Sequence, residues 1–229
     1  MTLRGILFDF NGTLFFDSDI HIHLFQEYHQ EYGKEIPSAD FIVSHIFGRD
    51  NATILRQNFK PDATDKEAEA FSQAKEERYR DFCLAHPDRL RLTDGAEEML
   101  NHLKACGIPF ALATGSEWDN VVFYREQLGL GRWFTSENTV YIDGTFPGKP
   151  APDIYQIAAA RLGLSPSECL VFEDGTSGIL AANRAGAGAV VALYENGLPS
   201  PINEHTRVNG VQHNFTEWRA LLADYGLTR

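Results

Sequence analysis

The chain contains few cysteines, and their spacing excludes the usual cysteine-based scaffolds. Only three occur in 229 residues, Cys83, Cys106 and Cys169. An odd number of widely spaced cysteines forms neither a disulfide framework nor a CxxC or zinc-binding pattern. We therefore expect reduced thiols and a cytoplasmic protein.

Positive charge and long apolar runs are scarce as well. The chain has 20 Lys and Arg against 32 Asp and Glu, a formal net charge of -12, which repels a phosphate backbone or an anionic membrane surface. No apolar run reaches the roughly 20 residues of a membrane span. The first ten residues run directly into an apolar segment and lack the cleavage region of a signal peptide. We expect neither nucleic acid nor membrane as a partner.

Four short apolar runs indicate buried parallel strands, over residues 5–8, 109–114, 169–173 and 188–193. A polar or glycine turn and then a helical pattern follow each run, and helices are predicted over 94–105, 117–129, 152–163, 176–186 and 216–224. Strands that alternate with helices predict an α/β fold with a Rossmann-like, doubly wound parallel sheet.

Residues 18–90 differ from the rest of the chain because they show helical periodicity without a strand pattern. This segment predicts an all-helical cap, inserted into an α/β core domain formed by residues 1–17 and 91–229. Two short β-like runs also flank Asp143-Gly144 within "ENTVYIDGTFPGKP", a combination that favours a tight hairpin.

Polar residues gather where the predicted strands end, and ligands of open parallel sheets bind beyond that edge. Carboxylates, hydroxyls, a lysine and a glycine turn are expected there: Asp9, Thr114, Gly115, Ser116, Lys149, Glu173 and Asp174. This set suits phosphoryl transfer, because a carboxylate can attack phosphorus and further carboxylates can hold Mg²⁺. Lysine, hydroxyls and turn amides would bind the phosphoryl oxygens.

Four motifs in order, "DFNGT", "ALATGS", "GKPAPD" and "VFEDGTSGI", give the chain a specific resemblance. It resembles the haloacid dehalogenase superfamily, and is similar in layout to its capped phosphatase and beta-phosphoglucomutase branch. The resemblance implies a magnesium-dependent phosphatase or phosphomutase that acts on a small phosphorylated metabolite, such as a sugar phosphate. We expect a monomer or weak dimer.

The resemblance also implies roles for individual residues. Asp9 would be the nucleophile that forms an aspartyl phosphate. Asp174, assisted by Glu173, would bind the magnesium ion together with Asp9. Thr114 and Lys149 would bind the phosphate.

Asn11 departs from the family pattern, which usually has a second aspartate at this position as the general acid and base. Asparagine keeps the main-chain carbonyl that would bind the metal, but its side chain cannot donate and accept a proton in turn. Losing general acid–base catalysis typically costs roughly 10²–10⁴-fold in rate. We therefore expect impaired hydrolysis.

Three further residues are candidates for substrate binding. Ser116 either contacts the substrate or caps the following helix. His21 either partly replaces the missing carboxylate or is an ordinary polar residue of a helix. Arg49, in "IFGRD", either binds a second anionic group of the substrate or is a surface charge.

Two other classes of function remain open from the sequence. A non-catalytic homologue that binds a phosphate ligand would keep the pocket and lose turnover. A haloacid dehalogenase would use Asp9 against carbon instead of phosphorus, but Lys149 and the Glu173-Asp174 pair favour phosphate.

Overall fold

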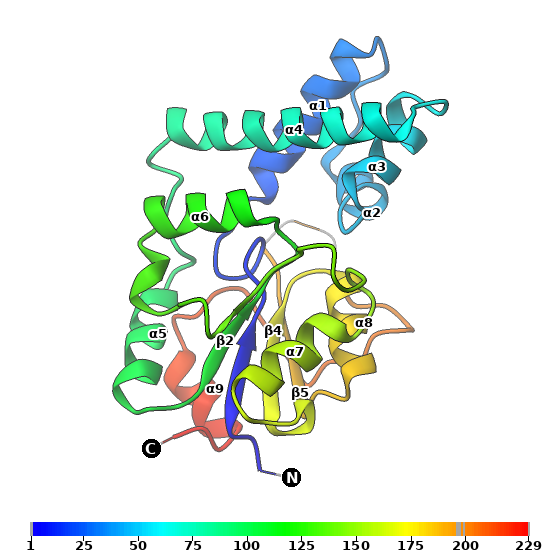
Figure 1. The fold of residues 1–229 in the computed structure, drawn as a ribbon. Coiled ribbons are helices and arrows are strands. Elements are labelled where there is room, and N and C mark those ends of the chain that lie inside the picture. Colours follow the sequence, from blue (N-terminus) through cyan, green and yellow to red (C-terminus); the bar gives the residue numbers. More distant parts are fainter. Residues whose placement is uncertain (1, 196–197, 199, 229) are drawn as a thin grey trace. The chain divides into compact units, whose positions relative to one another are not determined.

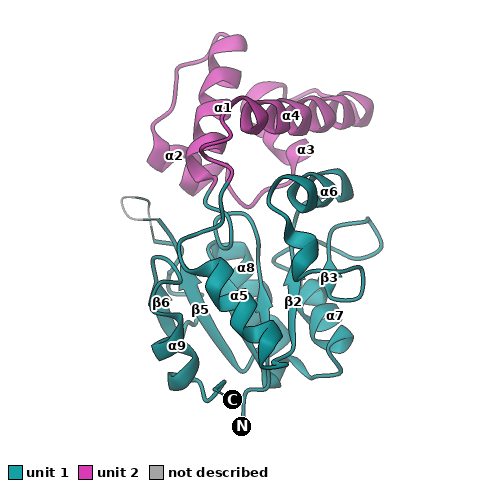
Figure 2. Ribbon diagram, turned by 90° about the vertical axis from the view of Figure 1, so that its left-hand side faces the viewer, with its two compact units in different colours: residues 1–16, 91–229 teal, residues 17–90 magenta. Residues whose placement is uncertain are grey.

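The computed structural model of the protein describes residues 2–195, 198 and 200–228. The chain divides into two compact units (Figure 2). The core unit comprises residues 1–16 and 91–229, and the helical unit comprises residues 17–90. Each unit is described separately below.

The core unit is built on one parallel sheet (Figure 1). Its strands in the described part of the chain are β1 (Gly5–Phe8), β2 (Phe110–Ala113), β3 (Thr139–Val140), β4 (Cys169–Glu173), β5 (Ala189–Leu193) and β6 (Gly210–Gln212). Their spatial order is β3-β2-β1-β4-β5-β6, and every neighbouring pair is parallel. This arrangement confirms the predicted α/β fold class. It also puts the carboxyl end of β1 between those of β2 and β4.

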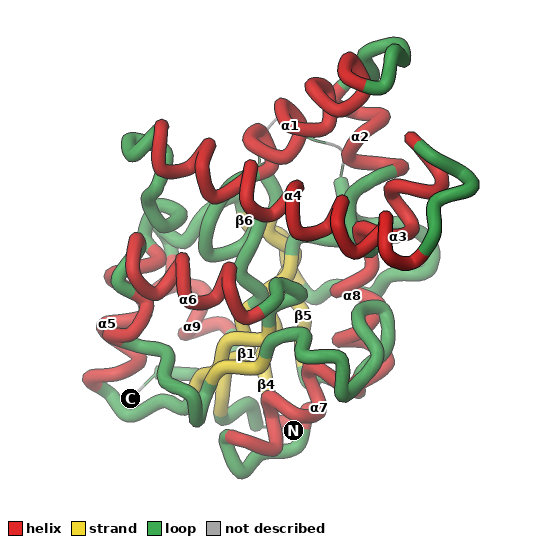
Figure 3. The backbone as a smooth tube through the Cα atoms, turned by 45° about the horizontal axis from the view of Figure 1, so that its top comes forward, coloured by secondary structure: helices red, strands yellow, loops and turns green. Residues whose placement is uncertain are grey.

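Helices cover both faces of this sheet. The core-unit helices are α5 (Ala96–Ala105), α6 (Trp118–Gln127), α7 (Asp153–Arg161), α8 (Thr176–Ala185) and α9 (Trp218–Asp224), with short 3₁₀ turns at Leu130–Arg132 and Pro166–Glu168. Helices α7 and α8 pack on one face, and α5 and α9 lie over the other (Figures 1 and 2). In the tube view the strands likewise lie together between helices (Figure 3).

Burial on both faces explains why the strands are continuous apolar runs rather than alternating ones. Leu7 and Val171 belong to a buried cluster that includes residues of α7 and α8. Phe8 and Phe172, their neighbours along the strands, stack with ring centroids 5.3 Å apart, and the ring of Phe215 meets both edge-on. The sheet is thereby fixed from both sides beneath its carboxyl edge.

The predicted hairpin around Asp143-Gly144 is wrong. The chain before this turn forms β3, which pairs in parallel with β2, and no strand follows it as far as Pro152. The Asp143 side chain closes the turn locally by accepting hydrogen bonds from the main-chain N–H and the hydroxyl of Thr145. Gly144 has φ +80°. Aspartate and glycine favour many kinds of turn besides that of a hairpin.

In the helical unit the structure shows only helices and loops. They are α1 (Ser18–Glu31), α2 (Ala39–His45), α3 (Asn51–Ile54), a π-helical turn (Leu55–Phe59) and α4 (Asp65–Ala85). Helix α4 begins with a complete capping box between Thr64 and Glu67. The unit has its own apolar core, to which Phe25, Tyr28 and Phe71 contribute.

Among the described residues, no helix combines the length and the hydrophobicity required to span a bilayer.

Candidate active site

The loop after β1 presents Asp9 at the carboxyl edge of the sheet. The Asp9 side chain is largely buried, and its main-chain N–H donates to the carbonyl of Phe172 at 3.0 Å. The loop then folds back, with the Gly12 N–H donating to the Phe15 carbonyl at 2.7 Å. Gly12 has φ +74°, and a Cβ there would lie 2.0 Å from Asp174 Oδ2. Only glycine fits this backbone conformation and this close approach to Asp174.

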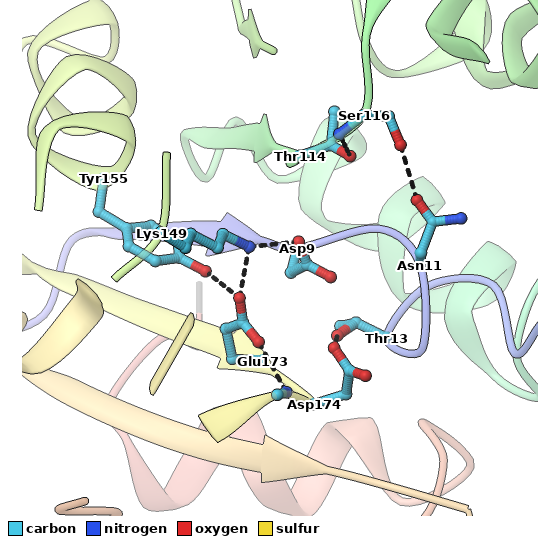
Figure 4. Close-up of polar contacts among 10 residues, drawn as sticks. Asp9, Asn11, Thr13, Thr114, Ser116, Lys149, Tyr155, Glu173 and Asp174 are labelled. Carbon is cyan, nitrogen blue, oxygen red and sulfur yellow. Dashed lines mark hydrogen bonds and ion pairs between the residues drawn. The ribbon is translucent and has the colours of Figure 1, made fainter. Parts of the chain in front are cut away.

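Three carboxylates converge from the ends of the adjacent strands β1 and β4. Asp9, Glu173 and Asp174 each offer an oxygen, and these oxygens all lie within 4.8 Å of one another. Lys149 reaches the same place from the loop before α7 (Figure 4). Its Nζ lies 2.5 Å from Asp9 Oδ1 and also donates to Glu173 Oε1. One largely buried cation therefore joins two of the three acids.

The environment of Lys149 favours its charged form. Burial alone would lower the pKa of Lys149, but the negative charges of Asp9 and Glu173 raise it above its ordinary value. The ammonium group therefore remains a cation at neutral pH. It offsets repulsion between the two carboxylates and would attract an anionic ligand.

Glu173 is held by a side chain of α7 and by the main chain of the turn before α8. The Tyr155 hydroxyl, from α7, donates to Glu173 Oε1 at 2.8 Å, and the Gly175 N–H, just before α8, donates to Oε2 at 2.9 Å. Burial, followed by the charge of Glu173, raises the pKa of Tyr155 well above its ordinary value, so the phenol stays a donor. A Cβ on Gly178 would lie 1.6 Å from Glu173 Oε1, so glycine provides the space for this carboxylate.

The cluster fits a hard divalent cation. Its three carboxylates supply the oxygen ligands that such ions prefer. Gly12 leaves room for the Asp174 carboxylate beside the Asp9 loop. Thr13 Oγ1 lies 3.5 Å from Asp174 Oδ1, a distance too long for a strong hydrogen bond (Figure 4).

The side chain of Asn11 is bound by two hydroxyls from the β2–α6 region. Ser116 Oγ donates to Asn11 Oδ1 at 2.8 Å (Figure 4), and Asn11 Nδ2 donates to the hydroxyl of the buried Tyr124 at 2.9 Å. The Ser116 N–H in turn donates to Thr114 Oγ1 at 3.1 Å. Gly115 lies within this short turn. The residues after β2 thus fix the orientation of the Asn11 amide.

The other two predicted site residues belong to the helical unit and have partners within it. His21 Nε2 lies 3.2 Å from Asp17 Oδ2, and the His21 ring stacks on Tyr79 with centroids 4.7 Å apart. Arg49 donates to Gln57. Substrate binding by His21 and Arg49 stays a prediction.

Two tyrosines of this site, Tyr155 and Tyr124, were missed by the sequence reasoning. Tyr155 follows Lys149 by six positions and lies in the first turn of α7. Tyr124 lies on the buried side of α6 with Val121. In the sequence, each is simply a tyrosine on the buried face of a predicted helix. Packing in the core would explain such a tyrosine equally well.

Comparison with known proteins gives a consistent relationship. The family model of the haloacid dehalogenase-like hydrolases matches residues 3–186. YhcW of Bacillus subtilis (strain 168) is 31% identical over 192 residues, 82% of this chain and 83% of that protein. The fructose-1-phosphate phosphatase YqaB of Escherichia coli (strain K12) is 30% identical over 186 residues, 81% of this chain and 94% of that protein.

Among solved structures, a family IA haloacid dehalogenase-type hydrolase from Entamoeba histolytica is similar over 94% of this chain and 95% of its own. The two chains share 35% sequence identity, with a TM-score of 0.83. The family match extends from before β1 to the residue that follows α8 and includes the whole carboxylate cluster. The chain therefore belongs to the haloacid dehalogenase-like hydrolase family.

Proposed function

We propose that the chain is a magnesium-dependent phosphatase or phosphomutase that acts on a small phosphorylated metabolite through an aspartyl phosphate at Asp9. The observation that carries this proposal is the largely buried Lys149 ammonium, 2.5 Å from Asp9 Oδ1 within a cluster of three carboxylates. A carboxylate nucleophile needs positive charge nearby when an anionic phosphate approaches. The relationship to a fructose-1-phosphate phosphatase supports phosphate esters as the substrate class.

In the proposed reaction, an Asp9 carboxylate oxygen attacks phosphorus and the bond from phosphorus to the leaving oxygen breaks. Lys149 neutralises part of the charge on Asp9 and on the transferred group. The Thr114 hydroxyl and the main-chain N–H of Gly115 would donate to the phosphoryl oxygens. The Ser116 N–H would do the same after leaving Thr114 Oγ1, to which it now donates.

The carboxylates of Asp9, Asp174 and Glu173 and the main-chain carbonyl of Asn11 would hold the metal. When bound, Mg²⁺ supplies positive charge that reduces repulsion between nucleophile and phosphate. Glu173 already accepts hydrogen bonds from Lys149, Tyr155 and Gly175. We therefore propose that it contributes less to metal binding than Asp9 and Asp174 do.

The second half of the reaction would be impaired. Release of the phosphoryl group from Asp9 requires activation of water or of an acceptor hydroxyl, and an amide at position 11 cannot remove that proton. His21 is the proposed partial substitute. Arg49 is the proposed contact for a second anionic group of the substrate.

Acid-quenched intact mass spectrometry tests this function directly. Purified protein is mixed with Mg²⁺ and acetyl phosphate and quenched over a time course, with Asp9→Asn as the control. We expect one phosphoryl group to appear on the wild-type chain, to persist, and to be absent from the control. Free phosphate released by the wild type without a persisting adduct would mean that turnover is intact and that another group replaces the missing acid and base. Equal release of phosphate by Asp9→Asn would contradict the aspartyl-phosphate mechanism.

The amide of Asn11 favours a second candidate, a phosphate-binding homologue without turnover. In that case phosphate would raise the melting temperature of the protein, while neither adduct nor free phosphate would form from acetyl phosphate. A third candidate, dehalogenation of a small haloacid by Asp9, predicts release of halide. The cation and the carboxylate cluster around Asp9 make it the weakest of the three.

A further inference from the structure

The chemistry of residue 11 restricts which substrates this site can use. The hydroxyls of Ser116 and Tyr124 bind the Asn11 amide over 2.8 and 2.9 Å. An amide side chain cannot give up a proton and recover it in turn at neutral pH.

The two hydroxyls also determine what a substitution at this position would do. A hydroxyl can either donate or accept a hydrogen bond. Ser116 already donates to Oδ1, so a carboxylate oxygen in the same place would keep this hydrogen bond. The donor that the amide offers to Tyr124 would be lost. Asn11→Asp is a nearly isosteric change that adds an acid.

The proton balance of the first step follows from these contacts. When Asp9 attacks phosphorus, the electron pair of the breaking bond moves onto the leaving oxygen. A protonated carboxylic acid at position 11 would supply a proton to that oxygen, which then leaves as a neutral alcohol. With asparagine at position 11 no carboxylic acid supplies this proton, so the oxygen keeps the electron pair and leaves as an anion. A proton from His21, the proposed partial substitute, would remove this requirement.

From this balance we propose that the preferred phosphoryl donors are those whose leaving group departs as a stable anion, namely acyl, enol or aryl phosphates. Simple esters of sugar hydroxyls are poor donors for this chain, because an alkoxide is a far stronger base than a carboxylate, enolate or phenolate. This inference rests on the proposed function, since it assumes attack by Asp9. The preferred substrates of this chain would therefore differ from the sugar phosphate named for its relative, the fructose-1-phosphate phosphatase.

Dependence on the leaving group provides the test. The rate of adduct formation on Asp9 is measured in single turnovers with Mg²⁺ and 2,4-dinitrophenyl, 4-nitrophenyl and phenyl phosphate. Wild type and Asn11→Asp are compared, with acetyl phosphate as a reference donor. For phenyl phosphate we expect Asn11→Asp to exceed wild type by about 10²–10⁴-fold, while for the dinitrophenyl ester the two rates agree within about tenfold.

Each outcome bears on the inference. The inference is supported if the wild-type rate of adduct formation falls steeply as the pKa of the leaving group rises, while the rate of Asn11→Asp falls only slightly. Equal slopes in both proteins overturn it, because another group then protonates the leaving oxygen. A shallow slope in wild type that becomes steep in Tyr124→Phe would also overturn it and would identify that group as Tyr124.

Two further readouts keep the test decisive. If Asn11→Asp fails to fold, as judged by its thermal melting, the wild-type slope decides alone. A wild-type rate that changes by less than about tenfold across the three aryl esters would overturn the inference. Absence of both adduct and free phosphate, even with acetyl phosphate, would instead overturn the proposed function itself, and the inference with it.

Discussion

The hydroxyl of Tyr155 donates to Glu173 Oε1 over 2.8 Å, and both side chains are almost completely buried. The same oxygen accepts a hydrogen bond from Lys149, whose Nζ also binds Asp9. Tyr155 is thus the outermost member of a hydrogen-bonded series that ends at the candidate nucleophile. A residue of α7 can therefore influence Asp9 without contacting it.

Tyr155→Phe is expected to destabilise the protein and to weaken binding of phosphate. It removes one donor from a buried carboxylate, and hydrogen bonds to charged groups contribute about 1.5–3 kcal/mol. We expect the free energy of unfolding of the core unit to fall by that amount, measured with urea. Titration calorimetry with inorganic phosphate and Mg²⁺ should show a raised Kd. An unchanged Kd would mean that Lys149 is positioned without help from Tyr155.

Tyr28→Phe serves as the matched control and carries the opposite expectation. Tyr28 lies in the core of the helical unit, and its buried hydroxyl has no hydrogen-bond partner among the described residues. An unsatisfied buried hydroxyl costs about 1–3 kcal/mol, so removing it should leave the melting temperature unchanged or raise it. The ring would still stack beneath the Arg78 guanidinium, 4.5 Å from the ring centroid. A clear fall in melting temperature would show that the hydroxyl has a partner, such as a bound water.

Gly178→Ala is expected to disturb the site from the opposite side. Its new Cβ would meet the Glu173 carboxylate at 1.6 to 2.4 Å, and the carboxylate would have to move. Since Glu173 binds Lys149, the affinity for phosphate should fall by about tenfold or more, equivalent to about 1.4 kcal/mol. Gly131→Ala is the control, because a Cβ there meets only the end of the Arg125 side chain at 3.7 Å. Equal phosphate affinity in both variants would contradict the assigned role of Glu173.

The sequence was informative where a single physical rule dominates. Buried parallel strands are apolar throughout, and the predicted strand over residues 169–173 is the observed β4. In a parallel sheet the residues at the carboxyl ends of the strands lie at the same edge. The sequence alone therefore predicted that Asp9 and Glu173 lie at this edge. Strand β6 was not predicted because it carries no apolar run: Val211 is exposed, and its two neighbours in the strand are only partly buried.

Contacts between distant parts of the chain were beyond sequence reasoning. Tyr124 and Asn11 are separated by 113 positions, and Tyr155 and Glu173 by 18. Which inward-facing residue meets which loop depends on the register and the crossing of several elements. The failed hairpin at Asp143-Gly144 has a related cause, since turn residues specify a bend but not the partner of the strand before it.

The helical unit contains a buried ion pair that should make its stability depend on pH. Lys75 Nζ lies 2.6 Å from Glu76 Oε1, which also accepts from Asn51 Nδ2 at 3.0 Å, and both charged side chains are mostly buried. Burial raises the pKa of Glu76, but the charge of Lys75 and these hydrogen bonds outweigh it and lower the pKa to about 2. In the unfolded chain the pKa of Glu76 would be about 4.5.

Because the folded pKa of Glu76 lies below the unfolded one, its contribution is complete above pH 4.5 and is lost as the pH falls towards 2. The difference corresponds to about 3 kcal/mol at pH 7 and less than half of that at pH 3. Glu76→Gln should therefore lower the melting temperature clearly at pH 7 and much less at pH 3. Glu69→Gln, at an exposed position of the same helix, should change little at either pH. If the effect of Glu76→Gln were equal at both pH values, the ionised carboxylate would not be the stabilising form.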